Sequence, residues 1–391
     1  MHEVVVTGYG VFTAFGPGVS ALRRGVFSGT PAFAEVNRFD SSRYRAHYAA
    51  EYSVGALSQL TVLRSCVKEA LSCSGQDGAG APVLLGTSGD HTSNVEFWRA
   101  HAARNDDEEN DSAGAGVMHS LPGLLPELIG EEFNFGRPRL AFVNACVAAT
   151  NAIAYGAHLI SIGKAQSVIC GGAFVVNEDV FAKFDSGRAL TTEALMRPFS
   201  RGRKGLLHGD GAAILVLESA EHAWRRGAAP LGIVRGWGLA ADAHHPVQPH
   251  PAGRGLAAAA RAALRVAGVS ADEVGYVNAH GTGTPRNDPA EALALRQIFG
   301  DRAGRVPVSS TKSTTGHMLE ATGAVEAVIT LLALADGLLP PTAGFVDADP
   351  DCPVDCVPLR ARPAPVSIAL SLNAAFGGAN AALVLGAPPS R

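Results

Sequence analysis

One cysteine stands where an apolar strand is expected to turn into a helix. Cys146 follows the apolar segment 141–143 and precedes the small residues 147–149. This pattern predicts a thiol near a helix N-terminus, where free NH groups and the helix dipole favour a thiolate, lower the thiol pKa and can hold an oxyanion. A lone cysteine in an Ala-rich stretch is, however, more often a buried structural residue.

Three further segments favour a reactive thiol. His280 directly follows a short apolar strand, in a turn rich in Gly and Thr where backbone and hydroxyl groups can approach a ligand. His317 ends a second such turn, five residues after Lys312. The segment 371–380 offers a Gly-rich backbone bend. Each segment alone is compatible with an ordinary turn, so the interpretation depends on their combination.

The elements that must position these residues repeat along the chain. The pattern of the opening strand, 4–11, is repeated at 233–239, where an apolar run and Gly-x-Gly recur. A second echo relates 138–162 to 306–335, because each reads as an apolar strand, a turn of small residues and an Ala-rich helix. One turn carries the cysteine and the other carries a histidine. Two echoes in the same order predict two related halves.

The halves are expected at 1–230, with the nucleophilic cysteine, and 231–391, with both histidines. Alternating strands and helices predict an α/β fold with mainly parallel sheets covered by helices. Further strands are expected at 82–86, 167–171, 212–218, 274–278, 367–372 and 381–386. Further helices are expected at 57–72, 253–267 and 289–299. The acid-rich segment 104–112 is expected to be a solvated loop.

Composition narrows the function classes. Hydrophobic residues make up 47% of the 391 residues and charged residues 17%, as in a large globular protein with an extensive interior. A net charge of -4 without a basic run argues against nucleic acid. No signal peptide and no apolar run of membrane length are present, so a cytoplasmic location is expected. The six cysteines predict free thiols, and Cys352 and Cys356 lack the second pair that a zinc site needs.

Together and in this order, the segments resemble the β-ketoacyl-[acyl carrier protein] synthase (ketosynthase) family, in the elongating branch shared by fatty acid and polyketide assembly. The resemblance covers nearly the whole chain. A cysteine with two histidines and a lysine separates this branch from thiolases and from Cys-His-Asn starter synthases. Its other motifs are the opening Val-Thr-Gly-Tyr-Gly, Arg197-Pro198-Phe199, Gly209-Asp210-Gly211-Ala212, His280-Gly-Thr-Gly-Thr, Asn287-Asp288 with Glu291, and Phe376-Gly377-Gly378.

The resemblance implies a thiolase fold, a five-layered αβαβα sandwich of two duplicated halves, normally a dimer. It implies decarboxylative Claisen condensation of a Cys-bound acyl group with malonyl-acyl carrier protein. No metal and no bound cofactor are implied, because the substrates are carried on the phosphopantetheine arm of acyl carrier protein or on CoA. The implied partners are acyl carrier protein and a second subunit, identical or a ketosynthase-like paralogue, with no nucleic acid and no membrane.

The resemblance also implies roles for individual residues. Cys146 would attack the acyl thioester, with its own NH and that of Phe376 as the oxyanion hole. His280 and His317 would hold the malonyl thioester carbonyl, so that decarboxylation gives a stabilised enolate. Lys312 would set the electrostatics around His317. Its expected partner is Glu326, and the expected substrate contacts are Thr282, Thr284, Gly377 and Gly378.

Other polar residues have less specific interpretations. Three lie in a segment that resembles a mobile loop of the family, and their use in catalysis stays open: Asp242, His244 and His245. Two are expected to be structural: His208 and Cys170. Arg203 and Lys204 fit a contact with an acidic carrier protein as well as they fit a solvated face.

The chain departs from the family pattern at two turns beside the thiol. The nucleophile turn usually reads Thr-Ala-Cys, whereas here Asn144 precedes Ala145. The gate, the loop around Phe376 beside the thiol, usually reads Gly-Phe-Gly-Gly, whereas here Ala375 precedes Phe376, and its Cβ restricts backbone swing. Ala374 replaces a usual aromatic residue. These differences favour a specialised pathway such as polyketide or polyene assembly. The alternatives are an acyltransferase that forms an ester or amide and a non-catalytic chain-length subunit, against which the cysteine argues.

Overall fold

The computed structural model describes residues 2–55, 57–92, 94–103 and 117–388. Their strands form one large mixed sheet in the order β13-β11-β10-β15-β16-β9-β1-β8-β7-β5-β6, and β2 pairs with β1. The expected loop at 104–112 lies outside the described residues. Helices cover both faces of this sheet, so the chain has the α/β fold with thiolase-like layers that its sequence predicts.

The sheet contains two groups of strands with the same order and directions. The N-terminal group is β6 (Arg139–Phe142), β5 (Val83–Gly86), β7 (Ser167–Phe174), β8 (Gly211–Ser219) and β1 (Val4–Thr13). The C-terminal group is β11 (Pro307–Ser309), β10 (Tyr276–Asn278), β15 (Ile368–Ala374), β16 (Ala379–Gly386) and β9 (Gly232–Ala241). In each group the first three strands pair in parallel, the fourth pairs antiparallel with the third, and the fifth pairs antiparallel with the fourth. A short antiparallel contact between β1 and β9 joins the groups.

The expectation of mainly parallel sheets was wrong for the last two strands of each group. Residues 375–378 connect β15 to β16, and so short a connection cannot contain the crossover helix that a parallel pair requires. Alternation of strands and helices along the chain does not reveal which neighbours run antiparallel. The candidate cysteine and histidines each follow a strand in the parallel part of a group.

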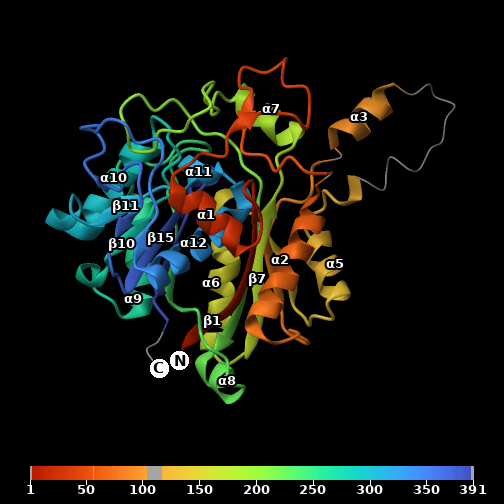
Figure 1. Ribbon diagram of the computed structural model, residues 1–391, viewed down its shortest axis with the longest axis vertical. Helices are drawn as coiled ribbons and strands as arrows, with labels where there is room; N and C mark the ends of the chain where they lie inside the picture. Colours follow the sequence, from red (N-terminus) through yellow and green to blue (C-terminus); the bar gives the residue numbers. More distant parts are fainter. Residues whose placement is uncertain (1, 56, 93, 104–116, 389–391) are drawn as a thin grey trace.

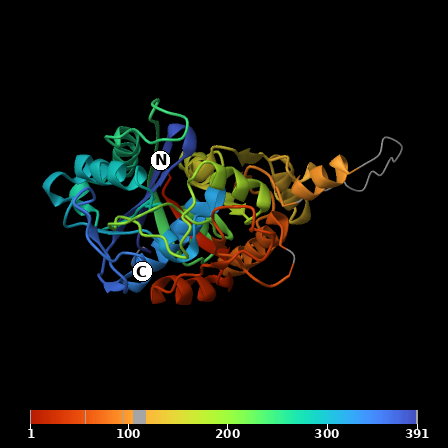
Figure 2. The ribbon, with the colours of Figure 1, turned by 90° about the horizontal axis from the view of Figure 1, so that it is seen from above.

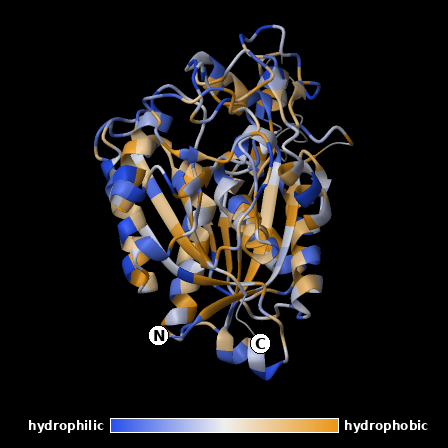
Figure 3. Ribbon diagram, turned by 60° about the vertical axis from the view of Figure 1, so that its left-hand side comes forward, coloured by the Kyte–Doolittle hydropathy of each residue, from blue (hydrophilic) through white to orange (hydrophobic). Residues whose placement is uncertain are grey.

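Two apolar helices form the centre of the molecule. α6 (Ala148–Ser161) and α12 (Thr322–Asp336) contact each other and lie between the two strand groups (Figure 1). All residues of α12 from Thr322 to Leu334 are buried, which fits a helix that is hydrophobic on every side. In Figure 3 the strands and inner helices are mainly orange, whereas blue segments gather on the outer helices and loops.

Four further helices cover the outer faces. α2 (Gln59–Ser74) and α5 (Leu124–Glu132) cover the N-terminal group, and α9 (Arg254–Ala267) and α10 (Asn287–Phe299) cover the C-terminal group. The smaller elements are β2 (Gly16–Pro17), α1 (Val19–Ser28), β3 (Ala34–Glu35), β4 (Tyr48–Ala49), α3 (Asn94–Ala102), α7 (Glu178–Ser186), α8 (Ala220–Arg225), η2 (Ala271–Glu273), η3 (Gly300–Arg302), β12 (Leu338–Leu339), β13 (Asp355–Cys356) and β14 (Arg362–Pro363). Seen from above, α3 extends away from the body (Figure 2). Within the described ranges, no helix combines the length and hydropathy needed to cross a bilayer.

Candidate active site

A strained turn presents Cys146. β6 ends at Phe142, and the chain enters the short 3₁₀ turn η1 (Ala145–Val147) directly before α6. Ala145 has a φ of 51°, a left-handed conformation that residues with a Cβ seldom adopt and that is common at functional sites. Cys146 is buried, with 5% of its surface exposed. The turn therefore directs the sulfur inward, at the N-terminal end of α6.

The environment of Cys146 corrects one expectation. Burial, with a smaller contribution from the nearby Glu320 carboxylate, raises the pKa of the Cys146 thiol to about 12, although the charge of Lys312 opposes the shift. The sequence predicted a lowered pKa because the helix N-terminus favours a thiolate. Desolvation outweighs that effect in the free protein, so the resting group is a neutral thiol.

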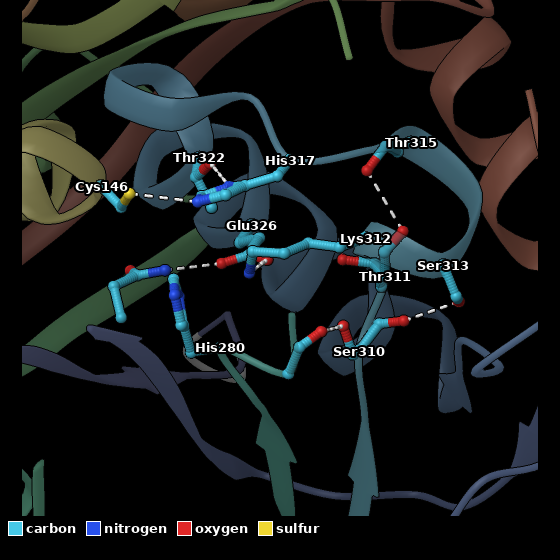
Figure 4. A network of polar contacts seen from close by, with 12 residues as sticks. Cys146, His280, Ser310, Thr311, Lys312, Ser313, Thr315, His317, Thr322 and Glu326 are labelled. Carbon is cyan, nitrogen blue, oxygen red and sulfur yellow. Dashed lines mark hydrogen bonds and ion pairs between the residues drawn. The ribbon is translucent and has the colours of Figure 1, made fainter. Parts of the chain in front are cut away.

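His317 contacts this thiol directly. Its Nε2 lies 3.1 Å from Cys146 Sγ, and its Nδ1 lies 3.0 Å from the hydroxyl of Thr322, the first residue of α12 (Figure 4). Burial lowers the pKa of His317 well below its usual value, and the charge of Lys312 lowers it further. The imidazole is therefore neutral. The contact with Thr322 was not predicted from sequence, although a hydroxyl five residues after the histidine was a visible signal.

His280 completes a pair of imidazoles. Its ring centroid lies 5.4 Å from that of His317 with the planes at 84°. The Glu291 carboxylate fixes the turn, accepting hydrogen bonds of 2.7 Å from the backbone NH groups of His280 and Gly281. Burial and the charge of Lys312 lower the pKa of His280 well below its usual value. Two neutral imidazoles thus lie edge to face in one pocket with the thiol, which His317 contacts.

A buried network holds Lys312 behind the histidines. In α11 (Lys312–Thr315), the Lys312 Nζ forms an ion pair of 2.5 Å with Glu326 of α12, and both side chains are inaccessible to solvent. Asn373 Nδ2 donates to the other Glu326 oxygen at 2.7 Å, and the Thr150 hydroxyl donates to Asn373 Oδ1 at 2.6 Å. The network links α6, α11, α12 and β15. Sequence reasoning found the ion pair but not its extension to Thr150 and Asn373.

Most of the predicted site residues open onto one pocket. It has a volume of about 590 Å³, and its lining includes Cys146, His280, Thr282, Thr284, His317 and Phe376. The Thr282 and Thr284 hydroxyls lie 3.0 Å apart. Gly377 and Gly378 do not line the pocket, so their expected substrate contact has no support from its geometry. Lys312 and Glu326 lie behind it and act through the histidines.

The gate residue Phe376 is held by two segments. Its ring, in η5 (Phe376–Gly378), stacks on that of Phe184 at 5.4 Å, and Phe184 also lines the pocket. The Gly377 NH donates to Pro246 O at 2.6 Å, and the Asp242 NH donates to Gly378 O at 2.8 Å. The loop that contains Asp242 therefore supports the gate through its backbone. Phe184 is a lining residue that no motif indicated.

The remaining candidate residues lie away from the reacting thiol and imidazoles. His244 and His245 are exposed and do not line the pocket. His208 is buried among aromatic rings, which lowers its pKa to about 3, and Cys170 is buried in β7. Lys204 is exposed at the pocket mouth and pairs with Glu193.

Arg203 requires a correction. Its side chain is 7% exposed and forms an ion pair of 2.5 Å with Asp349, so it is neither a solvated residue nor an accessible carrier contact. All six cysteines are free thiols, including Cys352 and Cys356. Within the described residues, no group of three or more His, Cys, Asp or Glu side chains could hold a metal ion.

Comparisons with known proteins agree with this geometry. The family models for the β-ketoacyl synthase N-terminal and C-terminal domains match residues 57–223 and 231–346. The chain is 32% identical over 406 residues to the 3-oxoacyl-[acyl-carrier-protein] synthase 2 of Coxiella burnetii, covering 98% of each chain. The chain belongs to the β-ketoacyl synthase family. It is an enzyme of the 3-oxoacyl-[acyl-carrier-protein] synthase type.

Two solved structures place the fold within this family. The structure described as the ishigamide ketosynthase/chain length factor is 32% identical, with a TM-score of 0.92, and the match covers 99% of this chain and 100% of that one. A type II polyketide synthase complex, AntDE with its acyl-carrier protein AntF, is 24% identical with a TM-score of 0.91 and 99% coverage of each chain. The second likeness concerns the fold alone.

Proposed function

We propose that the protein condenses a Cys146-bound acyl group with a malonyl unit carried on acyl carrier protein, as an acyltransferase of the ketosynthase type. The observation that carries the proposal is the contact of 3.1 Å between Cys146 Sγ and His317 Nε2, beside a second neutral imidazole in one pocket. Thiol and imidazoles are the groups that thioester exchange and enolate stabilisation require. We assign the halves as 1–230 and 231–391, which the matched strand groups support.

The first step forms the thioester on Cys146. The sulfur attacks the acyl carbonyl, the carrier thiol departs, and the NH groups of Cys146 and Phe376 hold the intermediate oxyanion. Because burial keeps the thiol neutral, its proton must leave as the new bond forms. His317 Nε2 is placed to accept that proton and to return it to the departing carrier thiol.

The second step breaks the malonyl C–C bond and releases carbon dioxide. The electron pair passes to the thioester as an enolate, whose oxygen accepts hydrogen bonds from His280 and His317. The enolate carbon then attacks the Cys146 ester, the C–S bond breaks as the new C–C bond forms, and the departing Cys146 thiolate takes up one proton from solvent to return to the neutral thiol. A hydroxyl can accept from Nδ1–H or donate to Nδ1, so Thr322 is compatible with both roles of His317.

The pocket mouth and one sheet edge have surfaces that fit the expected partners. Lys183, Arg188, Lys204 and Arg286 line the mouth and suit an acidic carrier protein whose arm enters past Thr282 and Thr284.

β6 ends the strand order of the described sheet, and exposed Leu140, Val143 and Tyr155 lie on it or near it. We assign this edge to the second subunit of a homodimer or of a heterodimer with a paralogue. The ishigamide structure described above pairs a ketosynthase with a chain length factor.

Two finer assignments accompany the proposal. The replaced gate residues Ala374 and Ala375 support a specialised polyketide or polyene pathway in preference to housekeeping fatty acid synthesis. A cytoplasmic location suits six free thiols, because the reaction requires Cys146 in its reduced form.

The deciding experiment loads the protein with a short acyl group, adds malonyl-acyl carrier protein, and follows carbon dioxide and the carrier-bound product by mass. Condensation gives a β-ketoacyl product while the Cys146 adduct disappears in step with decarboxylation. An adduct that survives malonyl carrier protein but is discharged by an alcohol or amine would establish simple acyl transfer instead. If no adduct formed at all, the remaining interpretation would be that the protein is a non-catalytic subunit.

A further inference from the structure

The loop that joins β9 to α9, residues 242–253, is bound to the gate at two backbone positions. The Gly377 NH donates to Pro246 O at 2.6 Å, and the Asp242 NH donates to Gly378 O at 2.8 Å. Three further residues of the loop line the pocket: Val247, Gln248 and Pro249. A change in the shape of this loop therefore affects both the gate and the pocket that contains the thiol.

Side chains of this loop accept the hydrogen bonds that other backbone groups accept in regular structure. Three of its residues have no backbone NH: Pro246, Pro249 and Pro251. Val247 and Gln248 donate their NH groups to His245 Nδ1 at 3.1 and 3.2 Å. Ala252 donates its NH group to His250 Nδ1 at 3.1 Å. Two imidazole nitrogens therefore hold the backbone of the segment that anchors the gate.

These hydrogen bonds require neutral rings. An imidazole nitrogen accepts a hydrogen bond only while it carries no proton, and a protonated ring has a donor at Nδ1 instead. His245 is exposed, so a proton from solvent reaches it directly, and histidine is the side chain whose charge changes between about pH 5 and 8. Ala243 has a φ of 47°, a conformation that the surrounding contacts must maintain. Loss of the two acceptors should therefore let the loop relax.

The charged groups around the loop act on these rings in opposite directions. Asp242 attracts a positive charge on either ring, but its carboxylate is held by the NH groups of His250 and Gly255 and by Asn380 Nδ2. The His244 ring lies 5.1 Å from that of His250. Four cations line the same pocket as the loop: Lys183, Arg188, Lys204 and Arg286. Protonation thus replaces hydrogen bonds by repulsion on the pocket side, while Asp242 holds the start of the loop.

We propose that His245 and His250 are positioning residues for the gate. While neutral they fix the loop that anchors Phe376, and each releases the loop when its Nδ1 takes up one proton from solvent. The inference rests on the proposed Cys146 thioester, because the gate acts on the acyl groups that this residue receives. A released gate is free to move, so the choice among acyl groups becomes less strict at acidic pH.

Hydrogen–deuterium exchange of the acyl-free protein tests the anchor directly. Mass spectrometry reads the peptides that contain Gly377 and residues 247–252, with rates corrected for the intrinsic effect of pH. In the wild type both peptides should exchange about 5-fold or more faster at about pH 5.5 than at about pH 8, because the hydrogen bonds to the two rings are lost.

Three variants separate the imidazoles from the rest of the loop. His245→Ala should exchange fast at both pH values, because it has no acceptor. The double variant His245→Asn/His250→Asn keeps acceptors that do not titrate, as in an Asx turn, and should exchange slowly at both. His244→Ala is the matched control, because it removes an exposed imidazole of the same loop that has no hydrogen bond to the backbone among the described residues, and it should behave as the wild type.

The ratio of Cys146 acylation rates with hexanoyl and decanoyl thioesters of N-acetylcysteamine tests the consequence for the reaction. Ionisation of Cys146 and His317 affects both rates alike and cancels in the ratio. The wild-type ratio should move toward unity by about 3-fold or more between about pH 8 and about pH 5.5. In His245→Asn/His250→Asn the ratio should stay constant.

The outcomes separate this inference from the proposed function. Wild-type exchange that is the same at both pH values, or a pH dependence that the double variant keeps in full, would overturn the role of the two histidines. A His245→Ala gate peptide that exchanges as slowly as that of the wild type would do the same. A wild type that forms no Cys146 adduct with either thioester would overturn the proposed function and the effect on selectivity, whereas the exchange rates would still decide whether the rings hold the loop.

Discussion

The two turns that meet at the pocket share a backbone feature but differ in their side-chain contacts, and each joins a strand to a buried central helix. Each turn has a residue with a Cβ in the left-handed region, Ala145 beside Cys146 and Leu319 two residues after His317, and Asn144 Oδ1 beside the cysteine has no partner among the described residues. The turn with His317 is followed by Thr322, whose hydroxyl contacts the imidazole, and is backed by the Lys312–Glu326 ion pair (Figure 4). The imidazole of His317 is thus held by a network of other side chains, whereas the hydrogen bond that the structure gives the Cys146 thiol is the one to His317.

Removal of the sulfur gives the largest expected effect and tests the cysteine side of this comparison. Cys146→Ala should form no acyl adduct and lose condensation by roughly 10³-fold or more, because no other thiol lies beside the two imidazoles. Intact mass after incubation with an acyl thioester measures this. Cys73→Ala is the matched control, since Cys73 is exposed and should leave the adduct unchanged. An adduct that persists in Cys146→Ala contradicts the assignment.

Removal of each imidazole separates the two steps. His280→Ala and His317→Ala should each slow condensation by roughly 10²-fold or more, because each loses a positioned donor to the enolate oxygen. In both variants acylation should survive better than condensation. His317→Ala should impair acylation more than His280→Ala, since only His317 contacts Sγ in the structure. Single-turnover acylation and product formation measure the two effects, and wild-type condensation in both variants would refute the mechanism.

Disruption of the ion pair tests the rigidity of the histidine side. Lys312→Met leaves Glu326 buried without its counter-charge and should lower the free energy of unfolding by about 3–5 kcal/mol. The double variant Lys312→Met/Glu326→Gln should recover part of that loss, which chemical denaturation measures. Equal stability of Lys312→Met and the wild type would show that the pair is not needed to hold the turn.

The same variant makes a prediction about pH. Lys312 lowers the pKa of His280 and of His317, so both imidazoles should stay neutral in wild type at pH values well below the usual value of about 6.5. In Lys312→Met both pKa values rise, and the acid limb of the condensation rate should move to higher pH. Below about 6.5 the unfolded chain binds protons that the folded chain does not, so wild-type stability should fall as pH decreases.

Thr322 offers a smaller change on the histidine side. Thr322→Val removes the hydroxyl that contacts His317 Nδ1 while keeping the side-chain shape, and should slow condensation by about 10-fold through loss of ring orientation. Thr322→Ser keeps the hydroxyl and should stay close to wild type. The ratio of the two rates is the measurement. Similar slowing in both would assign the effect to packing.

The gate gives the smallest expected effect. Ala375 has extended backbone angles, with φ −133° and ψ 156°, so its methyl group is accepted in the observed conformation and Ala375→Gly should cost at most about 1 kcal/mol of stability. The added backbone freedom should let Phe376 move and broaden the range of acyl groups that Cys146 accepts. Competition among acyl thioesters of different length measures this. An unchanged preference would place selectivity elsewhere in the pocket.

The sequence by itself determined the chemical groups and their order along the chain. Cys146, His280, Lys312 and His317 each lie in a turn that small residues mark, and the family motifs around them are local. Five helices, among them the mainly apolar α12, and most strands also follow from local sequence patterns, whereas α1, α5 and α7 were not predicted. Such features depend on residues close in sequence, so they can be read without coordinates.

The tertiary structure decided what depends on distance and burial. Desolvation made Cys146 a neutral thiol with a pKa of about 12, where the local helix terminus predicted the reverse. Packing brought Thr150 to Asn373, Phe184 to Phe376 and Glu320 to the cysteine turn, contacts between residues far apart in the chain. Burial and long-range contacts are properties of the folded chain as a whole, and the free energy of a charge depends on both.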